Sequence, residues 1–241
     1  MHEAVSASRA MADRITKGQT LAEGVYQELR GDILTCRLRP GAKLQINLLA
    51  EDRKLSLSGI REALSRLSAE GLVIAEPQRG FHVTPVSLQD LTDLTMTRID
   101  IENLCLARSI EHGGVDWETG IVAAAHRLSK TPYWASGDDR RLSEEWVSAH
   151  NAFHEALVSA CDSVWRLRIR SSLYHQSERY RRLSVPVLSR KRDVDAEHRA
   201  ISDAALSRKK TRACDLLKEH LILTMNIIIR GLPLESELNE R

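Results

Sequence analysis

The spacing of apolar residues divides the chain near Pro85. Before this residue, apolar positions three or four apart mark helices, and two short apolar runs then mark a pair of strands. After it the β signals stop, and helical spacing continues almost to the end of the chain. The pattern predicts a mainly α protein, with three helices and a β-hairpin in its first part and an all-α bundle of about six helices in its second.

The first part opens with two helices. Thr20 is a candidate cap for a helix whose apolar residues recur every four positions, and this helix cannot continue through the Pro40–Gly41 turn. A short second helix is expected over residues 47–54, with Leu48 and Leu49 facing inward.

The third helix has the clearest signals. Ser56 is a candidate N-cap, and Gly71 ends the helix because glycine adopts the left-handed conformation at little cost. Residues 72–74 and 81–84 then predict two strands joined by a turn at 77–80. The apolar stripe of the helix consists of Ile60, Ala63, Leu64 and Leu67. Three helices and a hairpin in this order outline a winged helix-turn-helix, which we assign to residues 20–86.

A polar, basic face lies opposite that stripe, near the start of the third helix. Such a face suits contact with the major groove and with phosphates, although single arginines of this kind often serve only to solvate a helix. The ordered arrangement therefore carries the prediction, not any one arginine. The expected DNA-binding residues are Ser56, Ser58, Arg61, Ser65 and Arg66 on the helix and Arg79 and Gly80 in the hairpin turn.

The stretch REALSRLSAEGL, with RPGAKL before it and PQRGFHV after it, resembles the DNA-binding domain of the GntR family of bacterial regulators. The resemblance covers about residues 20–86 and implies that Arg61 contacts DNA and that Arg79-Gly80 reaches the minor groove or the backbone. Leu57 stands where the family usually has arginine, and Gly59 where it usually has proline. Losing that arginine removes a contact worth ~1–3 kcal/mol of discrimination and predicts an atypical operator.

Helical patterns fill the second part, which we assign to residues 87–231, between a flexible arm (1–19) and a C-terminal tail (232–241). Breaks are expected at Gly113-Gly114, Thr131-Pro132, Asp162 and Val185-Pro186. The interior of such a bundle is a natural place for a ligand. The expected helices span about residues 88–112, 117–130, 139–160, 163–183, 191–206 and 209–230.

Four histidines in this part are candidate metal ligands. His150 and His154 lie four positions apart, which places their Cβ atoms ~5–6 Å apart on one helix face. Such a pair can chelate a metal ion, and a bundle can bring His198 and His220 to the same point. A hydrogen-bonded role in the core is the alternative, and the spacing alone leaves both open.

Over about residues 88–230 the chain is similar to the helical ligand-sensing domain called FCD, found in the FadR-like branch of the family. The similarity rests on Arg98 to Glu102, Phe153-His154, Glu197-His198 and His220. It implies a divalent metal ion bound by the last three histidines, with His150 in place of the family's aspartate. A fourth imidazole favours zinc or nickel over magnesium or calcium. Because the site has one carboxylate fewer, a bound ion would also attract an anionic effector more strongly. A histidine cluster without metal is the alternative.

The resemblance further implies that Arg98 holds an effector carboxylate, and we take Arg98, Glu102 and Trp146 as the candidate effector-binding residues. An ion pair with Glu102, four positions later, is the alternative. Trp146 precedes His150 by four positions and either lines the pocket or packs in the core. The nine lysines and arginines between Arg166 and Arg192 are interpreted as a solvated helix face, not as an extension of the DNA-binding surface.

Composition adds little to these motifs. The net charge is +2, so the prediction of DNA binding depends on the motif and not on charge. Four cysteines without a CxxC pair argue against a thiolate zinc site or a disulfide framework. No apolar run reaches the ~20 residues of a membrane helix, and Met1 to Gln19 lacks the apolar block of a secretory signal. We expect a cytoplasmic, nucleoid-associated protein without a membrane partner.

These features together predict a homodimeric repressor on a palindromic DNA operator, controlled by a small carboxylate bound near a metal ion. A repressor that senses the metal itself is an alternative. A metal-dependent hydrolase is a weaker one, because four imidazoles without a partner carboxylate lack a general base. We therefore expect no enzymatic activity.

Overall fold

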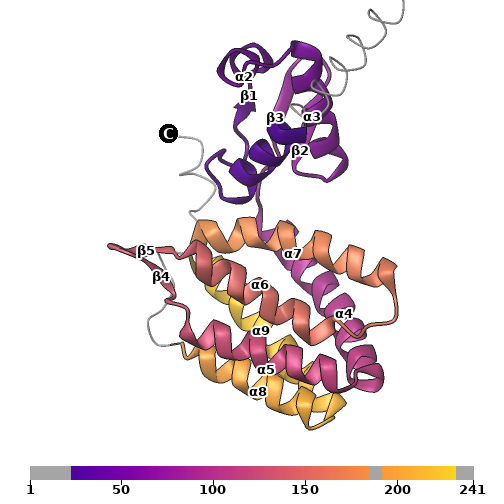
Figure 1. The fold of residues 1–241 in the computed structure, drawn as a ribbon. Coiled ribbons are helices and arrows are strands. Elements are labelled where there is room, and N and C mark those ends of the chain that lie inside the picture. The colour runs from indigo at the N-terminus through magenta and orange to yellow at the C-terminus, as the bar shows by residue number, and fades with distance from the viewer. Residues whose placement is uncertain (1–22, 185–191, 232–241) are drawn as a thin grey trace, which may run out of the picture. The chain divides into compact units, whose positions relative to one another are not determined.

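The structure is a computed structural model that describes residues 23–184 and 192–231. The predicted arm at 1–19, the cap Thr20 and the tail at 232–241 lie outside these residues. The chain divides into two compact units after Val86 (Figure 1). Most of the described residues are helical, as the apolar spacing predicts.

The first unit is a winged helix-turn-helix, which confirms the predicted fold. A helix over residues 23–34 precedes the helix-turn-helix pair, and the small antiparallel sheet has the strand order β1-β3-β2. Pairing of Val73 with Val83 and of Glu76 with Gly80 sets the register of the wing. Strand β1 was not predicted, because two residues are too short to show a period. The elements are β1 (Lys43–Leu44), α2 (Ile46–Asp52), α3 (Leu57–Ala69), β2 (Val73–Glu76) and β3 (Gly80–Val83).

The bounds of helix α3 are set by its capping residues, and its buried face by its apolar stripe. The Ser56 hydroxyl accepts a hydrogen bond from the Gly59 backbone N–H at 3.2 Å, which confirms the predicted N-cap. Gly71 has a φ of 72°, in the left-handed region that favours glycine. The stripe of Ile60, Ala63, Leu64 and Leu67 is buried, as predicted. These contacts fix which face of α3 is left exposed.

The prediction for α2 was partly wrong. The helix begins at Ile46, and Leu48, expected inside, is 56% exposed. Ile46, Leu49 and Ala50 pack against the core instead. A helix of seven residues makes only two turns, so its apolar residues do not define one face by spacing alone.

Removal of the α3 cap provides a test of this local account. Ser56→Ala is expected to destabilise the first unit by about 1 kcal/mol, because the Gly59 N–H loses its acceptor. Urea unfolding followed by circular dichroism measures the change. Ser65→Ala, an exposed change on the same helix, serves as the control, and an equal loss in both variants would contradict a capping role for Ser56.

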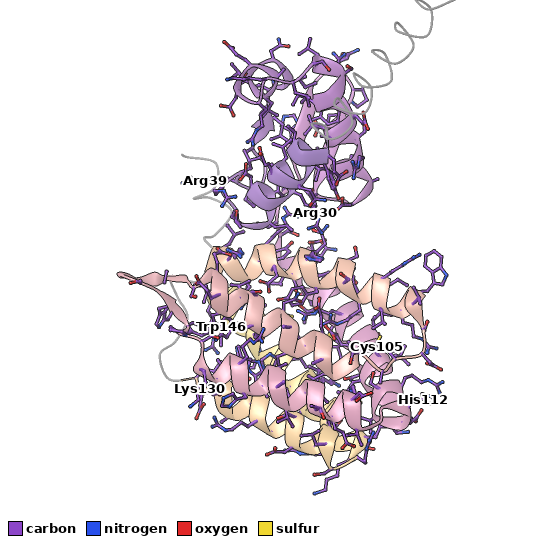
Figure 2. The ribbon with its side chains drawn as sticks, viewed as in Figure 1. Arg30, Arg39, Cys105, His112, Lys130 and Trp146 are labelled. Atoms are coloured by element: carbon purple, nitrogen blue, oxygen red, sulfur yellow. The ribbon has the colours of Figure 1, made fainter. Side chains whose placement is uncertain are left out.

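The second unit is a helical bundle. Helix α9 packs against α4, α7 and α8, while α5 packs against α6 and α8 (Figure 1). Cys105 lies inside the bundle, whereas His112 and Lys130 lie at its outside (Figure 2). No helix among the described residues is long and apolar enough to cross a membrane. The helices are α4 (Leu88–His112), α5 (Val115–Lys130), α6 (Glu144–Val158), α7 (Val164–Ser184), α8 (Val194–Leu206) and α9 (Lys210–Gly231).

A hairpin between α5 and α6 was not predicted. Strands β4 (Trp134–Ala135) and β5 (Asp138–Leu142) pair where a helix from residue 139 was expected. Gly137, with a φ of 77°, makes the turn. Helix α6 starts only after Ser143, whose hydroxyl accepts from the Trp146 N–H at 3.2 Å.

The start of α8 also differs from the prediction, by three residues. The Asp193 carboxylate accepts from the Ala196 N–H at 2.8 Å, so the helix begins at Val194.

Candidate metal centre and effector cavity

Four imidazoles meet inside the second unit. One nitrogen from each of His150, His154, His198 and His220 lies within 4.8 Å of the others. The Nε2 atoms of His150 and His154 are 3.3 Å apart. All four side chains are buried, none more than 7% exposed. The structure therefore brings together the four histidines that the sequence singled out.

Three helices supply these rings. His150 and His154 share one face of α6 because they are four positions apart, whereas His198 comes from α8 and His220 from α9. The Trp146 ring stacks on His150 with the ring centroids 4.7 Å apart, and Phe153 contacts His154 and His198 edge-on or tilted. Aromatic packing thus holds the imidazoles in place.

The histidines are uncharged in this environment. Burial lowers the pKa of His150, His154 and His198 well below the ordinary value, and neighbouring histidines lower it further. Burial also lowers the pKa of His220, although its hydrogen bond to Glu197 opposes this. Neutral imidazoles are the form that binds metal ions.

Glu197 orients His220. The Nδ1 atom of His220 lies 2.8 Å from Oε2 of Glu197, and the Arg192 Nε donates to the same carboxylate at 2.7 Å. Burial raises the pKa of Glu197, but the hydrogen bonds and charges of Arg192 and His220 outweigh it and bring the pKa to about 2. An ionised carboxylate only accepts hydrogen bonds, so Nδ1 carries the proton and Nε2 is left with its lone pair.

The donor set fits a divalent metal ion. The Nδ1 atoms of His150 and His154 and both ring nitrogens of His198 are buried without a hydrogen-bond partner. Buried polar atoms usually have a hydrogen-bond partner, so the unpartnered His198 nitrogen that belongs to the cluster indicates a ligand there. Four imidazoles suit zinc or nickel, and a carboxylate behind one of them is the arrangement that orients metal-binding histidines.

Glu197→Gln is expected to weaken metal binding by roughly 10- to 100-fold, because His220 loses its charged hydrogen-bond partner. Competition with a chromogenic zinc chelator measures the affinity. Glu219→Gln, an exposed change beside His220 on α9, should leave it unchanged. Equal affinities of the two variants would show that Glu197 has no part in the site.

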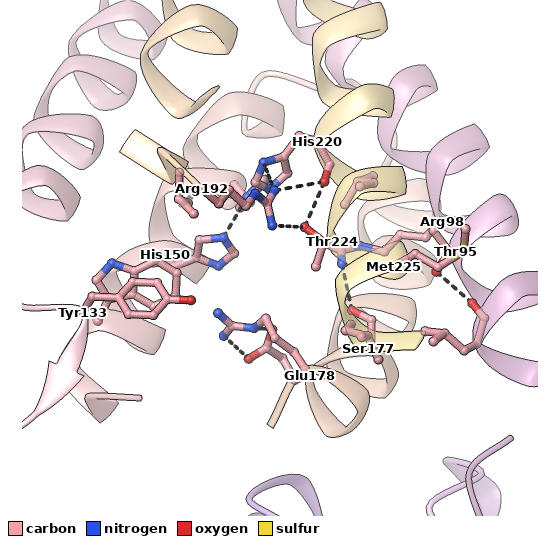
Figure 3. Close-up of a pocket in the computed structure, with 17 residues that line it drawn as sticks. Thr95, Arg98, Tyr133, His150, Ser177, Glu178, Arg192, His220, Thr224 and Met225 are labelled. Carbon is pink, nitrogen blue, oxygen red and sulfur yellow. Dashed lines mark hydrogen bonds and ion pairs between the residues drawn. The ribbon is translucent and has the colours of Figure 1, made fainter. Parts of the chain in front are cut away.

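A cavity of about 720 Å³, including the part open to solvent, adjoins the cluster. His150, His154 and His220 line it, together with Arg98 and Trp146. Figure 3 shows Arg98, Thr95, Ser177 and Met225 at one end of the pocket and Tyr133 and His150 at the other.

Arg98 both pairs with Glu102 and lines the cavity, the two alternatives that the sequence left open. Its guanidinium pairs with Glu102 at 3.2 Å, as the intrahelical alternative predicts. It also lines the cavity and donates to the Ser177 hydroxyl at 2.8 Å. Glu102 is 1% exposed and does not line the cavity; it accepts from Arg170 at 2.9 Å as well. Glu102 therefore supports two arginines.

Sequence reasoning missed two arginines of the cavity wall. Arg181 and Arg192 both line it, and Arg181 pairs with Glu178. The predicted solvated face over residues 166–192 is wrong for Arg170, Arg179 and Arg181, which are buried, the first and last with carboxylate partners. Arg190 and Lys191 of that stretch lie outside the described residues. The Glu178-x-x-Arg181 spacing, which allows an ion pair on one helix, was the available signal. Trp146 is 3% exposed and both lines the cavity and belongs to the core.

The DNA-binding candidates lie in the first unit. Ser58, Arg61 and Ser65 are exposed on α3, and the Ser56 and Ser58 hydroxyls are 2.9 Å apart. Leu57, in place of the family's arginine, is 44% exposed at the start of α3. The chain thus presents an apolar side chain where a cation is expected.

Arg66 is engaged within the unit. Its guanidinium pairs with Glu23 at 2.7 Å and lies over the Tyr26 ring, 3.8 Å from the centroid. These contacts tie α3 to the first helix and make Arg66 a weaker candidate than Arg61 for reading DNA.

The wing presents Arg79 to solvent. Its side chain is 79% exposed, with a loose pair to Glu76 at 3.6 Å, and Gly80 follows with a φ of 88°. Gly59 replaces the proline usual in the family, and its N–H makes the capping bond to Ser56 that proline cannot make.

Comparison with known proteins agrees with this architecture. The family described as "Bacterial regulatory proteins, gntR family" matches residues 21–83, and the FCD domain matches residues 93–223. The HTH-type transcriptional regulator BphR of Paraburkholderia xenovorans is 42% identical over 89% of this chain and 87% of its own length. The HTH-type transcriptional repressor GlaR of Escherichia coli is 35% identical over 84% of this chain and 93% of its own length.

Solved structures share the fold. Escherichia coli McbR/YncC aligns with a TM-score of 0.70 at 18% identity, over 87% of this chain and 97% of its own. A GntR protein of Rhodococcus sp. RHA1 aligns with a TM-score of 0.70 at 22% identity, over 88% of this chain and 99% of its own length. With the two domain matches and the identity to BphR and GlaR, the chain belongs to the GntR family of bacterial transcriptional regulators and carries an FCD domain.

Proposed function

We propose that this chain is a repressor whose affinity for its DNA operator is controlled by a small carboxylate, bound in the helical unit beside a divalent metal ion. The observation that supports it most directly is a cluster of four buried imidazoles, three of which line a cavity that Arg98 also lines. A guanidinium binds a carboxylate with two parallel hydrogen bonds, and the positive charge of a bound ion would attract the same anion.

In this proposal His150, His154, His198 and His220 hold zinc or nickel. When bound, the ion supplies a positive charge that attracts and orients an anionic effector. Arg98 binds the carboxylate, Ser177 fixes the guanidinium, and Trp146 packs against His150. Glu197 keeps the His220 proton on Nδ1, away from the ion.

On DNA, two chains form a symmetric dimer and place two α3 helices on the half-sites of a palindrome. Arg61 contacts DNA from α3, and Arg79-Gly80 does so from the wing. Effector binding favours a dimer geometry that no longer matches the operator spacing, and the extent of release is limited by the effector's difference in affinity for the two geometries.

A metal-sensing repressor is the second candidate, because four imidazoles could hold an ion without any ligand from an organic effector. An operator is first enriched from a random duplex library, and its affinity is then measured by fluorescence anisotropy with and without zinc and with and without a panel of carboxylates. We expect a carboxylate to weaken binding by about tenfold or more in the zinc-loaded protein, and zinc alone to have little effect. An equal response to zinc alone would favour the metal sensor, and failure to enrich any sequence would contradict DNA control altogether.

A further inference from the structure

Two leucines flank the cap of α3, and their surroundings differ. Leu55, just before Ser56, packs against the core of the first unit and lies so close to Gly59 that a Cβ on this glycine would be 2.7 Å from the leucine Cδ2. Leu57, the first residue of the helix, is 44% exposed and is not among the described residues that pack in this core. Packing of the first unit therefore explains Leu55 but not Leu57.

Leu57 lies on the face of α3 that is assigned to DNA. Residues four positions apart on a helix are neighbours on its surface, so Leu57 lies beside Arg61, and Ser65 follows Arg61 in the same way. All three side chains are exposed. In helix-turn-helix proteins the residues near the N-terminus of the reading helix contact the base edges. Leu57, the most N-terminal of the three, is therefore placed to meet the bases when α3 enters the major groove.

The polar groups beside Leu57 are engaged with each other. The Ser56 hydroxyl accepts from the Gly59 backbone N–H at 3.2 Å and lies 2.9 Å from the Ser58 hydroxyl. The hydroxyls on both sides of the leucine thus form part of the helix cap. The apolar surface of Leu57 is left as the feature that this end of the helix presents to a partner.

A leucine side chain has neither a donor nor an acceptor, so it cannot distinguish bases by hydrogen bonds. In the major groove the C5-methyl group of thymine is the apolar group that a base pair displays. Contact with leucine removes this methyl group from water, which is favourable. A G·C pair presents donors and acceptors instead, and these would lose water against the leucine without gaining a hydrogen-bond partner. A leucine in the groove therefore favours thymine.

From this placement we infer that Leu57 is a specificity-determining residue that contacts the C5-methyl group of one thymine in each half-site of the operator. The inference rests on α3 as the reading helix of the proposed repressor and adds the base that the helix prefers. Burial of one methyl group is expected to raise the affinity about fourfold, and burial at both half-sites of a symmetric dimer about 15-fold.

Replacement of thymine by deoxyuridine tests the inference, because deoxyuridine pairs with adenine in the same way but lacks the methyl group. Each symmetry-related pair of thymines in the enriched operator is replaced in turn, and the affinity of the full chain is measured by fluorescence anisotropy. We expect one pair whose replacement weakens binding of the parent chain about 15-fold, but binding of Leu57→Ala about threefold at most.

Leu104→Ala, which shortens a 49% exposed leucine of the second unit, is the control and should respond to deoxyuridine as the parent does. Leu57→Arg, taken through the same enrichment, should select guanine where the parent selects thymine, because arginine binds O6 and N7 of guanine. Circular dichroism checks that both Leu57 variants are folded.

The inference is overturned if no thymine of the operator is sensitive to deoxyuridine, if Leu57→Ala is as sensitive as the parent, or if Leu57→Arg still selects thymine. The proposed function survives these results as long as an operator is enriched and Arg61→Ala binds it more weakly. Failure to enrich any sequence would overturn both.

Discussion

Replacement of Arg61 by alanine is expected to weaken binding to the operator by about 100-fold or more while leaving the fold intact. Arg61 is exposed on α3, away from the buried stripe. A good arginine contact to a base edge discriminates by ~1–3 kcal/mol, and a symmetric dimer loses it at both half-sites. Fluorescence anisotropy with the enriched operator measures the loss, and circular dichroism checks the fold.

Arg37→Ala is the control for Arg61. It removes the same charge from the same unit, at a side chain that is 67% exposed and lies outside α3. We expect the operator affinity to fall by about threefold at most, because this variant loses only long-range attraction to DNA. Equal losses in the two variants would indicate non-specific attraction, and an unchanged affinity for Arg61→Ala would remove α3 as the reading helix.

Removal of metal should lower the thermal stability of the helical unit by roughly 10 °C. A ligand that binds only the folded state stabilises it by about 4 kcal/mol when present at a thousand times its dissociation constant. In a domain of this size each kcal/mol shifts Tm by about 2–4 °C. Differential scanning calorimetry before and after dialysis against a chelator measures the shift, and added zinc should restore the original Tm.

Two variants separate a metal effect from an effect of the chelator. His154→Ala combined with His198→Ala should show no response to chelation or to zinc. His126→Ala removes an exposed histidine outside the cluster and should respond as the parent does. A parent protein whose Tm is the same with and without metal would contradict a structural contribution from the ion.

The first unit was largely predictable because its signals are local. The α3 cap, its apolar stripe and the left-handed glycine at 71 all depend on residues within one or two turns of each other. Leu48 was misplaced because α2 is too short to define a face. The pairing of Arg66 with Glu23 was not predictable either, because 43 positions separate them and only the packed unit brings them together.

In the second unit, even more of the site depends on packing between helices that are far apart in the sequence. His150 and His154 share a face by helix geometry alone, so their proximity follows from the sequence. The approach of His198 and His220 depends on how α8 and α9 pack: a helical bundle allows it, and the resemblance to the FCD domain made it an expectation. Arg181 and Arg192 were missed because the rotation of α7 and the start of α8 decide which side chains line the cavity.

The proposed function depends on these four imidazoles holding a divalent ion beside the cavity. Elemental analysis of the full chain, purified without an affinity tag or chelator, tests it most directly. We predict about one zinc or nickel per chain, and none in the variant with His154→Ala and His198→Ala. A parent chain that contains no metal, and that takes up none when dialysed against zinc and nickel, would contradict the proposal.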